Sequence, residues 1–248
     1  MKQGYGVFSR VYDELMEFDY PGLVDFYESV FSHFSNKPLT LLDLACGTGK
    51  VTALLSQRGY DMVGVDASTE MLSMASANTC MEENVLLLCQ TMQELDLNDT
   101  VDGVVCSLDG INHLPTQDEV RKAFKHVALF LNQGGLFIFD IHSLLKMQKI
   151  LGNNTFLYDT TKSYCVWQNH WNKSALRVDY NLQIFIRQSG GLYRRYDEEF
   201  SEYYYEPDVL KSLLEQNGFE VLLITAGQEL KPFEGQNCDR HYVIARKI

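Results

Sequence analysis

Short apolar runs alternate with segments of helical periodicity along the first half of the chain. The apolar runs are almost continuous, which is typical of strands that are covered on both faces. The pattern predicts strands at Leu39–Leu44, Met62–Val65, Val85–Cys89, Val101–Cys106 and Leu136–Asp140, and helices at Thr48–Arg58, Ser68–Thr79 and Gln117–Leu131. Such alternation of strands and helices predicts right-handed crossovers and a parallel, doubly wound sheet.

The pattern changes in the second half of the chain. Polar and apolar residues alternate with period two between Thr155 and Tyr205, and Gly190–Gly191 is a hairpin signal within this stretch. Pro207 then opens a helix that Gly218 ends. Two final strands follow, at Glu220–Thr225 and His241–Arg246. We therefore expect an α/β fold that is interrupted by an antiparallel β insertion.

The order of these segments indicates one domain over residues 1–248. We expect a helical cap in residues 1–36 and the α/β core in residues 37–150 and 207–248. The insertion then occupies residues 151–206, where we expect it to act as a lid over the substrate.

Composition and charge narrow the class of protein. Hydrophobic residues make up 46% of 248, and the formal net charge is -12, which disfavours a nucleic-acid partner. No apolar stretch reaches membrane-spanning length. The six cysteines lack the spacing of a metal site, which indicates reduced thiols in the cytosol. We expect a soluble, cytoplasmic protein, monomeric or homodimeric, without a membrane or nucleic-acid partner.

The stretch LLDLACGTGKVT carries the first candidate chemistry. A strand that ends in a turn with Gly47 and Gly49 and then opens a helix offers free N–H groups and a close backbone approach. A dinucleotide site would require a third glycine where Thr52 stands, although it would also require an acid such as Asp66, 19 residues after Gly47. By these tests alone, a dinucleotide ligand and another nucleoside ligand both remain open.

Asp43 separates the two ligand classes. A carboxylate just before the turn is costly unless it meets a cation or several N–H donors. A ligand with an ammonium and a sulfonium group supplies such cations, whereas a pyrophosphate would repel the acid.

At this point the chain resembles the class I S-adenosylmethionine-dependent methyltransferases. The resemblance rests on the segments LLDLACGTGKVT, VGVDASTEML, VDGVVCSLDGINHL, GGLFIFDIHS and LLEQNGFEVLL, which follow in the family's order over essentially the whole chain. More narrowly, the chain is similar to bacterial small-molecule methyltransferases with a β insertion after the fifth strand. The resemblance implies a Rossmann-like, doubly wound, mostly parallel seven-stranded sheet. It also implies S-adenosyl-L-methionine as cofactor, S-adenosyl-L-homocysteine as product and a small-molecule acceptor.

The resemblance also implies which residues hold the methyl donor. Asp66 would accept hydrogen bonds from both ribose hydroxyls, Asp43 would face the amino-acid end, and Met71 would cover the adenine. The other residues that the resemblance places around the donor are Ala45, Gly47 and Gly49 in the turn, together with Tyr20, Ala67, Thr91, Met92 and Leu108.

Three residues are candidates for catalysis. Asp109 would orient an amine or hydroxyl of the substrate, or would only cap the next loop. His142 would contact the substrate or accept a proton, or would make a structural hydrogen bond. Glu198 resembles an acid of the insertion that faces the pocket in relatives, but a solvated strand face explains it equally well.

The expected reaction is in-line displacement of a methyl group, which requires alignment more than chemical activation. Histidines and carboxylates show no metal-ligand spacing, so no metal site is expected. Tyr5, Phe8 and Tyr12 would belong to a helical flap over the pocket, or to an ordinary amphipathic cap. Two other functions stay open: an NAD-dependent oxidoreductase, and a non-catalytic module that binds S-adenosylmethionine or a protein partner.

Overall fold

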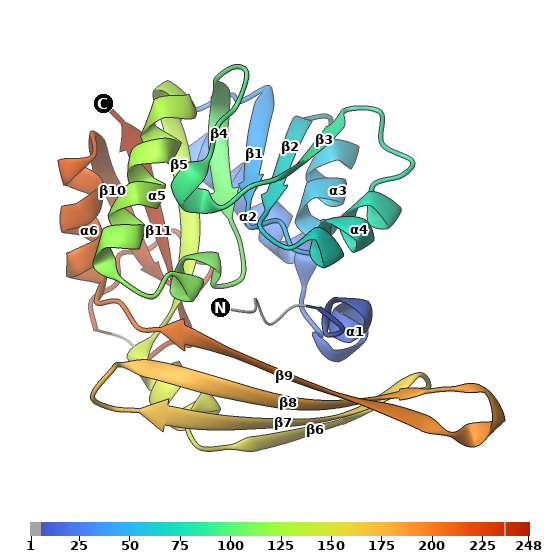
Figure 1. Ribbon diagram of the computed structural model, residues 1–248. Coiled ribbons are helices and arrows are strands. Elements are labelled where there is room, and N and C mark those ends of the chain that lie inside the picture. The colour runs from blue at the N-terminus through green and yellow to red at the C-terminus, as the bar shows by residue number, and fades with distance from the viewer. Residues whose placement is uncertain (1–5, 236) are drawn as a thin grey trace.

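The core of the protein is a seven-stranded sheet with the strand order β10-β11-β5-β4-β1-β2-β3. The computed structural model, shown in Figure 1, describes residues 6–235 and 237–248. The strands of this sheet are β1 (Thr40–Leu44), β2 (Asp61–Asp66), β3 (Val85–Cys89), β4 (Val101–Cys106), β5 (Leu131–His142), β10 (Phe219–Ala226) and β11 (Arg240–Lys247). The strands β1 to β5 pair in parallel, and β11 runs antiparallel between β5 and β10. The predicted Rossmann-like, mostly parallel sheet is therefore confirmed.

Helices cover both faces of this sheet because its central strands are apolar on both sides (Figure 1). On one face, α5 and α6 pack on a cluster that includes Phe137 and Phe139; on the other, α2 and α3 pack on a cluster that includes Leu41 and Tyr242. The longer helices are α2 (Tyr20–His33), α3 (Lys50–Gln57), α4 (Thr69–Asn78), α5 (Gln117–Phe130) and α6 (Pro207–Gln216). The shorter helical turns of the core are η1 (Met92–Glu94), η2 (Gly110–His113) and η3 (Lys146–Leu151).

The insertion after β5 forms a separate antiparallel sheet with the order β6-β7-β8-β9. Its strands are β6 (Thr155–Asp159), β7 (Ser163–Asn172), β8 (Arg177–Arg187) and β9 (Tyr193–Tyr203), with the turn η4 (Ser189–Gly191) before the last. Figure 1 shows this sheet facing the edge of the core from which η2 and α4 project, with the short helix α1 (Ser9–Leu15) between them. Phe8, at the start of α1, is fully buried. Its ring packs edge-on against that of Trp167, with the two ring centroids 5.3 Å apart. The predicted antiparallel insertion is also confirmed.

Two further sequence-level expectations concern cysteines and membrane helices. All six cysteines lie among the described residues and are free thiols. Within residues 6–235 and 237–248, no helix combines the length and apolarity that crossing a bilayer requires.

The turn between β1 and α3 requires residues that tolerate a left-handed backbone. Ala45, Gly47 and Gly49 have φ values of 59°, 54° and 73°. A Cβ on Gly49 would lie 2.9 Å from the Cβ of Ala75 in α4, whereas a Cβ on Gly47 would have no neighbour within 4 Å. Gly49 thus permits close packing of the turn on α4, and Gly47 leaves the surface above the turn open.

This difference predicts unequal effects of two matched substitutions. Gly49→Ala should lower the free energy of unfolding by about 2–4 kcal/mol, because left-handed strain adds to a clash with Ala75. Gly47→Ala should lower it by only about 1–2 kcal/mol, because the strain acts alone. Urea denaturation measures both values, and equal losses would contradict the packing role of Gly49.

Candidate functional site

The glycine turn lies directly beside the acid that ends β2. The backbone N–H of Gly47 donates to Asp66 Oδ2 at 2.9 Å, and that of Ser68 donates to Oδ1 at 2.8 Å. Burial raises the pKa of Asp66, and these two hydrogen bonds oppose the shift. The carboxylate keeps unused lone pairs, because each of its oxygens can accept two hydrogen bonds.

Asp43 is a buried acid with one unsatisfied oxygen. The hydroxyl of Thr52 donates to Oδ2 at 2.6 Å, but Oδ1 is buried and has no hydrogen-bond partner among the described residues. Burial raises the pKa of Asp43 to about 7, with a contribution from Asp66. A buried carboxylate oxygen without a partner is costly, so this position favours a cation or a hydrogen-bond donor from a ligand. Thr52, which stands where a dinucleotide site needs glycine, holds this acid in place.

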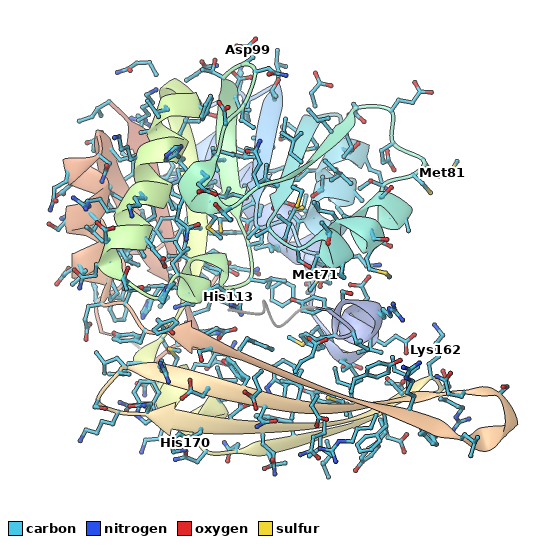
Figure 2. The ribbon with its side chains drawn as sticks, in the orientation of Figure 1. Met71, Met81, Asp99, His113, Lys162 and His170 are labelled. Atoms are coloured by element: carbon cyan, nitrogen blue, oxygen red, sulfur yellow. The ribbon has the colours of Figure 1, made fainter. Side chains whose placement is uncertain are left out.

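The other residues expected around the donor lie along the same edge of the sheet. Met71 is buried in α4, and its N–H donates to the capping Ser68 hydroxyl at 3.2 Å. Figure 2 shows the labelled side chains of Met71 and His113 at the edge of the core that faces the insertion. The remaining residues lie near this edge or beside it: Ala67 after β2, Thr91 and Met92 at η1, Leu108 after β4, and Tyr20 at the start of α2. Their roles in binding stay predictions.

The segment of residues 6–15, here called the strap, passes between the core and the insertion (Figure 1). Asp13 in the strap accepts from the hydroxyl of Thr48 at 2.7 Å and from the Asn78 amide at 3.2 Å, and it lies 3.4 Å from Lys50 Nζ. The strap is therefore tied to the glycine turn and to α4. Tyr5, expected in a flap over the pocket, lies outside the described residues.

Glu198 on β9 holds the other side of the strap. Its Oε1 accepts from the backbone N–H groups of Val7 and Phe8, the latter at 2.9 Å. Its Oε2 is buried and has no hydrogen-bond partner in the described chain, and burial raises the pKa of this acid. Glu198 thus binds main-chain groups of the strap, and a role toward substrate stays a prediction.

A second set of polar side chains gathers at the ends of β4, β5 and β9. His142 Nε2 lies 3.0 Å from Glu202 Oε2 and 3.5 Å from Asp109 Oδ1. The hydroxyl of Tyr180 donates to Glu202 Oε2 at 2.6 Å, and His113 Nε2 lies 3.7 Å from Glu202 Oε1. We call Asp109, His142 and Glu202 the acid–histidine cluster. It contains two of the three predicted catalytic residues, together with Glu202, which was not predicted.

Asp140 and Arg240 fix the position of Asp109 in this cluster. The buried carboxylate of Asp140 accepts from the N–H groups of Leu108 at 2.7 Å and Asp109 at 2.9 Å, and it pairs with Arg240. Leu108 and Asp109 are both left-handed, with φ values of 55° and 65°, so the turn is strained and held by these bonds. Arg240 Nη1 also lies 2.5 Å from Asp109 Oδ1. Although burial alone would raise the pKa of Asp109, His142 and Arg240 hold it well below its usual range.

The cluster offers ligand-type atoms to a metal ion, since Asp109, His142 and Glu202 place such atoms within 4.8 Å of one another. However, Arg240 already pairs with Asp109, and Tyr180 already donates to Glu202. The protein's own donors therefore satisfy the two acids, and the absence of a metal cofactor stays a prediction.

Glu202 and Arg240 were not identified from the sequence, although signals for both existed. Glu198 and Glu202 share one face of β9 because side chains alternate along a strand. Arg240 pairs in register with His142, because the antiparallel β11 begins where β5 ends. An antiparallel last strand therefore delivers its first residue to the ligand-binding edge of the sheet.

Comparisons with known proteins agree with this geometry. A family model described as a methyltransferase domain matches residues 41–135. A putative methyltransferase of Bacillus subtilis, YqeM, is 30% identical over 224 residues, which cover 90% of this chain and 89% of that protein. The crystal structure of an S-adenosylmethionine-dependent methyltransferase from Clostridium acetobutylicum is 31% identical, with a TM-score of 0.86 and 97% of each chain covered. The sugar N-methyltransferase KedS8 from Streptoalloteichus shares the fold, with 18% identity, a TM-score of 0.75, and coverage of 98% of this chain and 93% of that one.

The buried Asp43 predicts a pH dependence of stability. Its pKa is about 7 in the folded protein and 3.8 in a model peptide, so the folded state holds an additional proton between these values. The wild type should therefore lose stability as the pH rises through this window, with a total loss on the order of 4 kcal/mol that is complete above about pH 7. Asp43→Asn cannot titrate, so the variant should gain stability relative to the wild type over the same window.

Urea denaturation between pH 4 and pH 8 measures this difference. Any part of the difference in unfolding free energy that is the same at every pH would reflect the altered contact with Thr52. Asp61→Asn, which makes the same substitution at the exposed start of β2, serves as the matched control. A difference for Asp43→Asn that does not change with pH would contradict the raised pKa.

Proposed function

The chain belongs to the S-adenosylmethionine-dependent methyltransferase family, and we propose that it transfers the methyl group in line to a small-molecule acceptor. The observation that carries this proposal is the arrangement of Asp66, Gly47 and Asp43. An acid that keeps lone pairs, an open turn and an unsatisfied buried carboxylate oxygen lie along one edge. The acid suits the ribose of the donor, the open turn suits the chain that connects the ribose to the sulfur, and the unsatisfied oxygen suits the ammonium group.

In this proposal each part of the edge has a distinct binding role. The free lone pairs of Asp66 accept from the ribose hydroxyls, and Asp43 Oδ1 faces the ammonium end, directly or through water. Ala45, Gly47 and Gly49 leave the backbone accessible. The adenine would lie against the apolar side chains of Met71 and Met92, with Ala67 and Thr91 at its borders, while Leu108 and Tyr20 would border the methionine end and the methyl group.

When bound, S-adenosylmethionine supplies an electrophilic methyl carbon whose leaving group is a neutral thioether. The protein then has to align the nucleophile and exclude water, rather than activate the leaving group. The strained turn at Leu108 and Asp109, fixed by Asp140, provides a rigid wall for this alignment. The insertion and the strap would act as the lid that excludes water.

The acid–histidine cluster would bind the acceptor. Two acids beside His142 suit a nucleophile that carries a proton, such as an amine or a hydroxyl. Asp109 can accept a hydrogen bond from it, and His142 or Glu202 can take up the proton. We assign His142 and Glu202 to proton acceptance and Asp109 to orientation, with Glu198 holding the strap. The net charge of -12 and the name of the sugar N-methyltransferase with the same fold both support a small molecule.

Neither alternative function receives support from a specific contact. An NAD-dependent oxidoreductase would place a pyrophosphate near the unsatisfied Asp43, which would repel it. A non-catalytic binding module would give no reason for the fixed contacts of His142 with two acids.

Calorimetry tests the donor site. The wild type should bind S-adenosylmethionine and its homocysteine product but not NAD, and Asp66→Ala should weaken binding at least about tenfold, because charge-assisted hydrogen bonds to the ribose are lost. Asp61→Ala, at the exposed start of the same strand, should retain wild-type affinity. Unchanged affinity of the Asp66 variant, or preferential binding of NAD, would refute the proposed site.

A label-transfer experiment tests the acceptor side. With a donor tritiated in its methyl group and a bacterial extract, label should enter the low-molecular-weight fraction rather than RNA or protein. Glu202→Gln should slow this transfer by about a hundredfold without changing donor affinity, because the proton acceptor is lost. Glu199→Gln, exposed on the same strand, is the matched control. Label in RNA or protein would exclude a small-molecule acceptor, and normal transfer by Glu202→Gln would exclude its role.

A further inference from the structure

A cavity of 460 Å³ opens beside the acid–histidine cluster. Its volume lies within the range that small-molecule sites occupy. Segments far apart in the sequence form its walls: the connection from α1 to α2, the turn after β4, the start of η3 and the start of β11. Leu108, Asp109 and Arg240 belong both to this cavity and to the surroundings of the cluster. A molecule in the cavity would therefore border the proposed site of methyl transfer.

The charged residues of the cavity lining differ in exposure. The acids Glu17, Asp19 and Asp239 are solvent-exposed, whereas Asp109, Lys146 and Arg240 are partly buried. Exposed acids are screened by water and ions, so they affect a bound ligand less than partly buried charges do. Because Asp109 pairs with Arg240, Lys146 is the partly buried charge of the lining that no opposite charge in the lining balances.

The two cations differ in their partners. Arg240 is paired with Asp109 and Asp140, which neutralise it. Lys146 Nζ, by contrast, makes no hydrogen bond or ion pair with any residue of the described ranges. The backbone N–H of Lys146 donates to Ser143 Oγ at 3.0 Å. A partly buried ammonium without a counterion is unfavourable, because it loses hydration without replacement. Of the two cations that line this cavity, Lys146 is the one without a partner of opposite charge in the described ranges.

The electrostatic surroundings of Lys146 agree with this reading. Burial lowers the pKa of its ammonium, and the neighbouring Arg240 lowers it further, whereas Asp109, Glu202 and Asp140 oppose this shift. An anion beside Lys146 would favour the charged form and reverse this shift. A cationic group in the same place would be repelled by Lys146.

We propose that Lys146 is a specificity-determining residue that binds an anionic group of the methyl acceptor, a carboxylate or a phosphate, inside this cavity. The acceptor would then lie with its anionic end at Lys146 and its nucleophile toward Asp109, His142 and Glu202. This orientation rests on the proposed function, because it takes the cluster as the place of methyl transfer. The anion site itself depends only on the cavity and its unpaired lysine.

Titration with inorganic phosphate and, separately, with acetate tests the anion site by calorimetry at constant ionic strength. At least one anion should bind the wild type with a dissociation constant of about 1 mM, as expected for one ion pair in a preformed cavity. Lys146→Met should weaken this binding at least about tenfold, and Lys146→Arg should retain it. Tighter binding of phosphate would indicate a phosphorylated acceptor, and tighter binding of acetate a carboxylic acid.

Lys149→Met is the matched control, because Lys149 lies in the same short helix and is exposed. This variant should bind the anion as the wild type does. Equal binding by the wild type and Lys146→Met would overturn the proposal, as would the absence of binding of both anions to the wild type at about 50 mM.

The same proteins separate failure of this inference from failure of the proposed function. Lys146→Met should bind S-adenosylmethionine with wild-type affinity, which also shows that the variant is folded. Anion binding that depends on Lys146 in a protein that does not bind the donor would uphold the anion site and refute the methyl-transfer site. Normal donor binding without anion binding would refute the anion site and leave the methyl-transfer site upheld.

Discussion

The carboxylate of Asp140 joins three parts of the protein on which the candidate site depends. It lies on β5, accepts from both N–H groups of the strained turn after β4, and pairs with Arg240 at the start of β11. Because it is fully buried, these partners are necessary to offset the loss of hydration. The same contacts position Asp109 beside His142, and they leave Arg240 in the wall of the cavity. One buried acid thus determines the geometry of the acceptor side.

The carboxylates along the ligand-binding edge differ in what neutralises them. Asp140 and Asp109 have Arg240, whereas Asp66 has only N–H donors and Asp43 has one hydroxyl and an unsatisfied oxygen. The acids on the side of β5 are therefore balanced by a cation of the protein, whereas those on the side of β1 and β2 are not. A ligand that carries positive charge complements the side of β1 and β2. A ligand that carries negative charge complements the cavity beyond β5, since Lys146 lacks an anionic partner there.

Local sequence patterns were sufficient for the fold and for the proximity of Gly47 and Asp66, because both depend on parallel strands whose carboxyl ends meet at one edge. They were not sufficient for Glu202. Period-two alternation places Glu198 and Glu202 on the same face of β9, but only tertiary packing determines which of them reaches the core. The side chain of Asn112 joins the end of β9 to β5: its N–H donates to the carbonyl of Tyr203 at 2.8 Å, and its oxygen accepts from the backbone N–H of His142 at 3.0 Å. The unpaired state of Lys146 likewise depends on contacts between segments that are distant in sequence.

The attachment of the strap to the insertion has a consequence for how this region can vary among homologues. Glu198 binds the main chain of Val7 and Phe8, so the contact itself does not depend on their side chains. Phe8 is still restricted by its burial against Trp167, and a side chain at Gly6 would approach Glu198 Oε1 to 3.3 Å. The contact with Glu198 therefore places no demand on the side chain at position 7, whereas the acid on β9, the small residue at position 6 and the ring at position 8 would have to change together.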